Sequence, residues 1–394
     1  MKKVLTILLV LLLSGCATSI KQEEEKEKVE PETFEPSTTS IKETPFYVYP
    51  IADKDGNMVI PLSADCLIIA TDEEKAEYMQ KKFEETILFY HMILDPTHEF
   101  AGINNIEVIN DNYGKGIIKV NSELIELLDS AITMSELTEG YFNPTIGSIS
   151  SVWKPLFNES HKNSDPSSED IENHLTASIP YNKLREYIVL DKENNTVEFK
   201  KLETTDLPVI IDLGAYAKGF VMDKCYNALL KYKAGFLIAA GGSSIVCHVE
   251  PTQEKLGWVI GVKNPNTGNS CFQIKVKDSF ISTSGDEEQF FINEEGIRRH
   301  HILNPYTGYP ENNYRSITLI ADGRADALDA LSTALYNTDD VDRTIANVSS
   351  NLGITIYKAM ITEDENKKLL LKYDQEFDEI YDVDAGQIKD ISNK

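Results

Sequence analysis

The stretch PVIIDLGAYAKGFVMD, residues 208–223, says most about the fold of this chain. Val209–Ile211 is a short apolar, β-branched run, which predicts a buried strand. The run ends at Asp212-Leu213-Gly214-Ala215, and a helical pattern follows from Ala217 to about Lys231. A strand that enters a helix through a glycine turn is typical of α/β proteins, so we expect a mixed α/β fold.

The turn between this strand and helix is also a candidate anion site. Backbone N–H groups at a helix start, with the Lys218 ammonium close by, suit a phosphate or diphosphate group. A turn with a purely structural role explains the same residues equally well. The choice depends on segments further along the chain.

Length and charge limit the possible functions. The chain has 394 residues, 41% of them hydrophobic and 26% charged, as in globular proteins. Its formal net charge is −26. No basic stripe offsets this charge, which argues against a nucleic-acid partner or an anionic membrane surface.

The N-terminus has the form of a secretory signal. Lys2 and Lys3 precede an apolar run, Val4–Leu13, that is too short to span a bilayer. The ending Leu-Ser-Gly-Cys resembles a bacterial lipobox, which implies a signal peptide over residues 1–15 and lipidation of Cys16. We therefore expect export and a lipid anchor in the cell membrane, facing the extracytoplasmic side. An uncleaved membrane anchor is the alternative.

A disordered tether is predicted for residues 16–44, because they are mostly Glu, Lys, Pro, Ser and Thr. The folded domain is then expected over residues 45–394. Four cysteines remain in it, without metal-ligand spacing. A Cys247–Cys271 disulfide is permitted, but we expect buried free thiols.

Periodicity predicts the remaining secondary structure. We expect Trp258–Val262 and Phe272–Val276 to continue the main sheet. The segment 158–170 is polar and is predicted to be an exposed excursion. The other predicted elements are strands Leu67–Ala70 and Gly235–Ala240, a hairpin of Ile188–Leu190 with Thr196–Phe199, and helices Asp72–Met92, Ser122–Glu136 (capped by its Ser) and Ala325–Leu335.

Two loops have the composition of ligand-binding segments. Thr138–Gly147 concentrates aromatics, Gly, Asn and Pro, so Tyr141 or Phe142 could lie against a flat ring. Gly241-Gly242 follows a predicted strand and permits close approach of the backbone to a ligand. Ordinary core aromatics and a simple tight turn are the alternatives.

A histidine pair and an Asp–Thr pair are candidates for chemistry. His300 and His301 would point to opposite faces of a strand, so at most one can face a given site. A structural histidine is the alternative. Asp329 and Thr333 share one helix face and could supply two oxygen ligands to Mg²⁺. Asp326 has Ala330 in the corresponding place. For Asp329, a bond to the backbone or an N-terminal helix interaction is the alternative.

Taken in order, these segments resemble the FAD:protein FMN transferase family, often called ApbE. The resemblance covers roughly residues 60–360. It rests on the upstream loop Thr138–Thr145, on Asp212–Gly219, Gly241-Gly242, Ser282–Gly285 and His301–Gly308, and on the helix with Asp329 and Thr333.

The resemblance implies a mixed α/β fold, a central mixed sheet flanked by helices, with FAD in an extended cleft. It implies Mg²⁺ bound by Asp329, Thr333 and the main-chain carbonyl of Ala215, with Lys218 near the diphosphate. The residues that it implies for flavin-nucleotide binding are Tyr141, Phe142, Asn143, Thr145, Asp212, Lys218, Gly241, Gly242, Ser284, Gly285, His301 and Thr307.

The implied reaction is attack by a threonine hydroxyl of a second protein on the FMN-side phosphorus of FAD. AMP leaves, and FMN stays joined to the acceptor as a phosphoester. His301 would move the hydroxyl proton or hold the phosphate. Family acceptors include exported subunits of Rnf-type and sodium-pumping quinone reductase complexes and other flavin-binding domains. An FAD hydrolase and a non-catalytic FAD-binding lipoprotein are the alternatives.

The chain departs from the family at three positions. Asn304 and Asn143 stand where Asp is common, and Ser243 stands where Asp or Asn is common. Each asparagine removes a negative charge and keeps hydrogen-bonding capacity. We therefore expect changes in binding detail more than in reaction class.

Overall fold

The structure is a computed structural model that describes residues 40–44, 51–59, 64–70, 73–158, 164–250, 257–374, 380–381, 383–384 and 386–392. The predicted signal peptide, Cys16 and most of the predicted tether lie outside these residues. None of the described helices combines the length and hydropathy needed to cross a bilayer.

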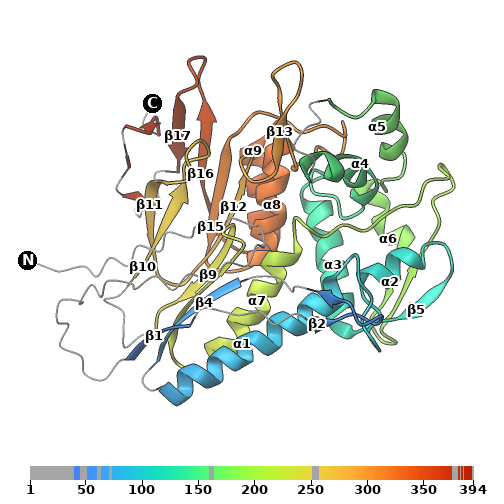
Figure 1. The fold of residues 1–394 in the computed structure, drawn as a ribbon, viewed down its shortest axis with the longest axis horizontal. Coiled ribbons are helices and arrows are strands. Elements are labelled where there is room, and N and C mark those ends of the chain that lie inside the picture. The colour runs from blue at the N-terminus through green and yellow to red at the C-terminus, as the bar shows by residue number, and fades with distance from the viewer. Residues whose placement is uncertain are drawn as a thin grey trace, which may run out of the picture.

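A nine-stranded sheet forms the centre of the described structure and lies on the left of Figure 1. Its neighbouring strands are antiparallel except for the last pair, which is parallel, so the sheet is mixed, as the sequence predicts. In spatial order the strands are β1 (Ser40–Thr44), β4 (Ala64–Ala70), β8 (Gly235–Ala240), β9 (Ser244–His248), β12 (Ser279–Gly285), β15 (Ser316–Ala321), β16 (Ile356–Glu363), β17 (Leu369–Tyr373) and β19 (Ile388–Asp390).

The tether prediction does not hold for Ser40–Thr44. These residues form β1, which pairs with β4 at an edge of the sheet. Pairing at a sheet edge uses backbone N–H and C=O groups, so it does not require the apolar pattern that sequence reading looks for.

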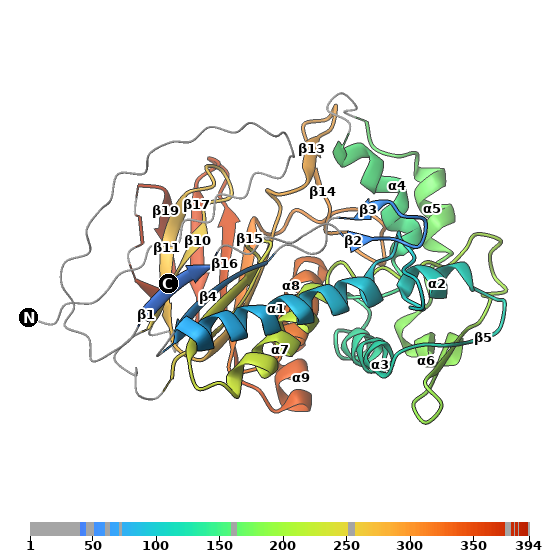
Figure 2. The ribbon, with the colours of Figure 1, turned by 60° about the horizontal axis from the view of Figure 1, so that its bottom comes forward.

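Both faces of the sheet are covered, because successive strand residues point to opposite sides. Ile68 joins a core under the helices α1 (Glu73–Leu94), α7 (Ala217–Leu230) and α8 (Ala325–Asn337). Leu67 joins a second core on the other face. Figure 2 shows α1 running along the layer that contains α7.

The second face is covered by a small separate sheet. Its strands are β10 (Trp258–Lys263), β11 (Ser270–Val276) and β18 (Ile380–Tyr381). The prediction that Trp258–Val262 and Phe272–Val276 continue the main sheet is therefore wrong. Both are apolar strands, but they pair with each other and cover the sheet instead of extending it, a choice that periodicity cannot make.

The remaining helices and short strands lie beside the main sheet, most of them on the right of Figure 1. They carry the loop 138–147 and the hairpin that leads to His301. These elements are α2 (Ile106–Asp111), β5 (Ile117–Lys119), α3 (Ser122–Leu137), α4 (Gly147–Asn158), α5 (Ser168–Leu175), a 3₁₀ turn (Tyr181–Lys183), α6 (Leu184–Tyr187), β6 (Ile188–Asp191), β7 (Thr196–Phe199), the pairs β2 (Ile51–Ala52) with β3 (Met58–Val59) and β13 (Phe290–Ile292) with β14 (Arg298–His300), and α9 (Val341–Leu352).

The predicted strand Val209–Ile211 is wrong, although the segment is buried as expected. It forms only an isolated bridge between Ile210 and Ile146. The Asn110 side chain donates to the Ile211 carbonyl and accepts from the Ile211 amide, at 3.0 and 2.8 Å. This side chain thus takes the place of a neighbouring strand.

Two smaller predictions have different outcomes. The N-cap residue of α3 is Asn121, and Ser122 is already the first residue of the helix, so the predicted Ser cap is wrong. The Asn121 side chain makes no capping hydrogen bond. Cys66, Cys225, Cys247 and Cys271 are buried and form no disulfide with one another, as predicted. Burial raises the pKa of the Cys66 and Cys225 thiols, which favours the protonated, unreactive form.

Candidate functional site

One cavity of about 520 Å³ brings together most of the candidate residues. It lies where the starts of α4 and α7, the middle of α8 and the ends of β8 and β12 meet. It also extends between the main sheet and β10–β11. Candidate residues in its wall are Tyr141, Phe142, Asn143, Asp212, Ala215, Lys218, Gly241, Gly242, Ser284, Gly285, His301, Asp329 and Thr333.

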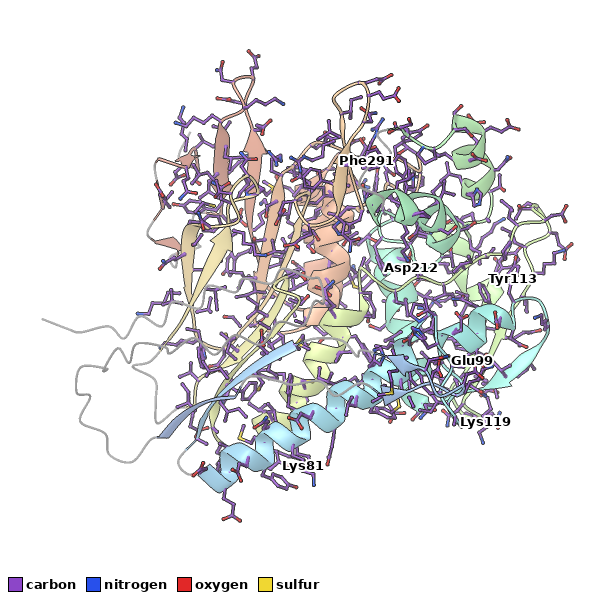
Figure 3. The ribbon with its side chains drawn as sticks, viewed as in Figure 1. Lys81, Glu99, Tyr113, Lys119, Asp212 and Phe291 are labelled. Carbon is purple, nitrogen blue, oxygen red and sulfur yellow. The ribbon has the colours of Figure 1, made fainter. Side chains whose placement is uncertain are left out.

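The segment before α7 supplies the charged end of the cavity, and Asp212 lies near the centre of Figure 3. Asp212 Oδ1 accepts from the Gly214 amide at 2.9 Å, and Oδ2 pairs with Lys154 Nζ at 2.8 Å. Burial raises the pKa of the Asp212 carboxyl, but Lys154 and these hydrogen bonds outweigh burial and hold it below its ordinary value. Asp212 is therefore an ionised group that orients Lys154.

Lys218 has a different environment from Lys154. Its Nζ makes one long contact, 3.5 Å, with the Gly214 carbonyl, and the described residues give it no carboxylate partner. Lys263, a third cation in the wall, is paired with Glu288 at 2.9 Å. Lys218 is thus the ammonium that is most available to an anion in this cavity.

Asp329 is a buried carboxylate in the cavity wall and is 5% exposed. Its Oδ1 accepts from the hydroxyls of Ser244 and Ser282, both at 2.7 Å. Its Oδ2 accepts from the Gly219 backbone amide at 2.7 Å. These three donors fix the carboxylate in place and leave Oδ2 capacity for one more contact.

The bond from Gly219 has a second effect. In a regular helix this amide would donate to the carbonyl four residues earlier, that of Ala215. Because it donates to Asp329 instead, no described group hydrogen-bonds to the Ala215 carbonyl. The site therefore offers a carboxylate oxygen, a free carbonyl and the Thr333 hydroxyl.

This all-oxygen set fits the preference of Mg²⁺ for hard ligands. In the described part of the chain, no three His, Cys, Asp or Glu residues cluster as metal ligands. A metal at this site would thus rely on one carboxylate together with neutral oxygens. Asp326 is not part of the set, because its carboxylate binds Arg324 and the Tyr216 hydroxyl.

A row of hydroxyl groups lies beside Asp329, and of its members Ser284 and Thr333 were predicted as site residues, whereas Ser282 and Ser332 were missed. Ser332 bonds to Ser282 and Ser284 at 3.2 and 2.8 Å, and Ser284 lies 3.5 Å from the Thr333 hydroxyl. Ser282 and Ser284 point to the same face because they are two apart on β12. That alternation within Ser282-Thr283-Ser284 was the available signal.

The aromatic loop contributes to the wall with part of its residues. Tyr141 and Phe142 line the cavity, and Tyr141 packs edge-on against Tyr306. Thr145 lies outside the cavity wall: it is fully buried, and its hydroxyl bonds to Asn143 Oδ1 and accepts from the Ile179 amide. Thr145 therefore does not line the cavity, where a flavin contact was predicted. Its hydroxyl instead holds the loop against Ile179.

Two of the departures from the family pattern have structural explanations. Asn143 Nδ2 donates to the Ile179 carbonyl at 2.9 Å, and Asn304 Nδ2 donates to the Glu311 carboxylate at 2.9 Å. An aspartate could make neither bond. Ser243 lines the cavity, and no side-chain bond explains its identity.

The paired histidines separate as predicted. His300 is fully buried, with Nε2 2.7 Å from the Glu311 carbonyl and Nδ1 accepting from the Ile302 amide. His301 lines the cavity. The residue is exposed to the cavity, but desolvation by the protein around its ring, with help from the Lys218 ammonium, lowers its pKa to about 4. The imidazole is therefore neutral at pH 7.

Thr307 is the other predicted ligand residue that lies outside the cavity wall. It is exposed in the turn after Asn304, where its hydroxyl accepts from the Tyr309 amide. The turn packs through Gly308, whose carbonyl accepts from Trp153. Trp153, Lys154 and Glu287 line the cavity and were not predicted, because nothing in their local sequence marks them.

Sequence comparisons identify similar proteins. A family model described as the ApbE family matches residues 65–355. The FAD:protein FMN transferase of Treponema pallidum (strain Nichols) is 27% identical over 242 residues, 59% of this chain and 64% of that protein. The FAD:protein FMN transferase of Klebsiella pneumoniae (strain 342) is 29% identical over 232 residues, which are 58% of this chain and 66% of that protein. The chain thus matches just under two thirds of the length of each of these relatives.

Solved structures agree on the fold. The ApbE protein of Thermotoga maritima superposes with a TM-score of 0.65 at 28% identity, covering 80% of this chain and 94% of that one. The flavin transferase ApbE of Vibrio cholerae superposes with a TM-score of 0.62 and covers 87% of this chain and 99% of that one. At 19% sequence identity, this likeness supports the fold alone.

Proposed function

Because this chain belongs to the ApbE family, we propose that it is an Mg²⁺-dependent FAD:protein FMN transferase acting on a threonine of another protein. One observation carries the proposal: three separate segments of the sequence supply the proposed metal ligands, cation and base to one cavity. These residues are Ala215 and Lys218, His301, and Asp329 and Thr333. An FAD hydrolase would use the same residues and differs only in the acceptor.

The charges of the cavity suit a diphosphate. The chain carries a formal charge of −26, so an anionic ligand needs local cations. Lys218 at the start of α7 and Lys154 on α4 supply them. Tyr141 offers its ring to a flavin or adenine ring, whereas Phe142 is buried in the core against Tyr216.

In the proposed reaction, the threonine Oγ bonds to the FMN-side phosphorus of FAD. The bond from that phosphorus to the bridging oxygen breaks, and AMP leaves with this oxygen. His301 is neutral, so it can accept the hydroxyl proton but cannot hold the phosphate as a cation. We therefore assign it the role of the base. Lys218 stabilises negative charge on the phosphate oxygens.

The residues that would hold Mg²⁺ are Asp329 through Oδ2, Thr333 through its hydroxyl and Ala215 through its carbonyl. When bound, the ion would neutralise phosphate charge as a Lewis acid. Ser244, Ser282 and the Gly219 amide position the Asp329 carboxylate for this role.

We propose that the protein acts outside the cytoplasm as a lipoprotein anchored through Cys16. The support is the sequence alone: Lys2 and Lys3, the run Val4–Leu13 and the Leu-Ser-Gly-Cys ending. Its acceptor would then be an exported flavin-binding domain, such as an Rnf-type or quinone-reductase subunit.

The first test is a transfer assay with the full chain, FAD, Mg²⁺ and a flavin-acceptor domain that carries a target threonine. We expect covalent flavin fluorescence on the acceptor band after denaturing electrophoresis, with release of AMP. The matched control replaces the target threonine by valine, which removes only the hydroxyl. AMP with free FMN and a dark acceptor would instead indicate a hydrolase, and bound FAD without AMP a carrier.

Lys154 provides a second prediction, on substrate affinity. Lys154→Met should raise the KM for FAD about three- to tenfold with little change in kcat, because it removes a cation and leaves the Asp212 carboxylate unpaired. The effect is modest because Lys154 is 61% exposed. Steady-state kinetics at low and high salt measure it.

The control is Lys81→Met, which removes the same charge from α1, far from Asp212 in Figure 3. It should leave KM unchanged. Equal KM values for the two variants would show that Lys154 does not contribute to FAD binding.

A further inference from the structure

Glu287 is a carboxyl group in the cavity wall that the proposed reaction does not use. It follows β12 and lies against Gly285: a Cβ added at Gly285 would be 2.1 Å from Glu287 Oε2. The glycine thus gives the carboxyl room to lie on the backbone at the end of β12, in the wall of the cavity.

The Oε2 atom is buried and has no hydrogen-bond partner among the described residues. Leaving a buried carboxyl oxygen unpartnered is costly, and few native groups are left so without a reason. The cost is highest for a charged oxygen, so the missing partner favours the protonated carboxyl, and Glu287 also lines the cavity, where its other oxygen, Oε1, is left for a ligand group.

The surroundings of Glu287 favour its neutral form. Burial raises its pKa to about 7, and the neighbouring Glu288 and Asp286 carboxylates add to this. Its own backbone amide and Lys263 of β10 act in the opposite direction without offsetting burial. Arg298 on β14, Tyr336 on α8 and Cys271 on β11 also interact electrostatically with Glu287.

Building on the proposed function, we propose that Glu287 is a ligand-recognition residue, which donates a hydrogen bond from its protonated carboxyl to a carbonyl oxygen or ring nitrogen of bound FAD. Both ring systems of FAD carry such acceptors. A carboxylic acid has one O–H to donate, and a carboxylate has none. Ionisation also places a negative charge next to a ligand that is itself anionic.

This role predicts the direction of a pH effect on binding. The protonated form binds, so affinity is full below pH 7 and falls as pH rises through about 7. His301 does not titrate in this range, because its pKa is about 4. The FAD diphosphate stays fully ionised throughout.

The test is titration of FAD into the full chain between pH 5.5 and 8.5, followed by flavin fluorescence, without acceptor protein. The wild-type Kd should rise about tenfold across this range. Glu287→Gln keeps a neutral donor of the same shape, so it should bind at every pH as the wild type does at pH 5.5. Glu287→Ala has neither donor nor charge and should bind about tenfold more weakly than Glu287→Gln at every pH.

The two variants separate donation from charge repulsion. Equal affinity of Glu287→Ala and Glu287→Gln would leave charge alone as the cause and would overturn the donor role. A flat wild-type profile, or tighter binding at high pH, would also overturn it.

Glu295→Gln is the matched control, because Glu295 is exposed at the tip of the β13–β14 hairpin and outside the cavity wall. It should keep the wild-type pH profile. No FAD binding by the wild type at any pH would reject the proposed function itself, a result distinct from a flat profile.

Discussion

Asp329→Ala is expected to reduce flavin transfer by roughly 10²–10³-fold or more. The change removes the only carboxylate among the three oxygen donors proposed for Mg²⁺. It also leaves the Ser244 and Ser282 hydroxyls and the Gly219 amide without their acceptor. Part of the loss could therefore come from a disturbed fold, so thermal unfolding must be measured alongside transfer.

Two matched variants separate metal binding from folding. Asp329→Asn keeps an oxygen that can accept from both serines but removes the charge, so it should fold and lose activity. Thr333→Ser should keep Mg²⁺-dependent transfer, whereas Thr333→Val should need far more Mg²⁺. A folded Asp329→Asn or Thr333→Val variant with wild-type Mg²⁺ dependence would reject the metal site.

Gly219→Ala is expected to lower the free energy of unfolding by about 3 kcal/mol or more. A Cβ at Gly219 would be 2.2 Å from the Ala325 carbonyl oxygen and 2.9 Å from the Asp326 Cα. Both are backbone atoms, so α7 and α8 would have to move apart. Transfer should also fall, because Ala215 and Lys218 lie at the start of α7 and Asp329 lies on α8.

Gly323→Ala is the control for this effect, because a Cβ at Gly323 meets nothing within 4 Å. It should change stability by less than about 0.5 kcal/mol. Chemical denaturation of the two variants measures the difference. Equal stability would mean that α7 and α8 do not cross as closely as the structure has them.

The regular elements and most of the wall were predictable, because they depend on local pattern. The apolar runs of β4 and β8 and the helices α1, α7 and α8 follow from periodicity. The motif Asp212–Gly219 and the Asp329–Thr333 spacing led to residues that now lie in one cavity. The predictions that failed concern residues whose environment is set by residues distant in the sequence.

Val209–Ile211 shows why. The segment looks like a strand, but Asn110, about a hundred residues earlier, satisfies its backbone. Lys154 and Glu287 likewise have no motif, and only the packing of α4 and of the residues after β12 brings them to the cavity. Thr145 belongs to a recognisable motif, yet its hydroxyl holds the loop together.

The β13–β14 hairpin has a consequence for how this protein could diversify. Its ladder pairs Phe290 with His300, and the His301 amide donates to the Gln289 carbonyl. These bonds hold the two wall-forming ends of the hairpin together, whatever the length of chain between them. The tip, which projects at the top of Figure 1, can therefore gain or lose residues while the reaction centre keeps its shape. Relatives could acquire new acceptor preferences by lengthening this loop, without redesigning the chemistry.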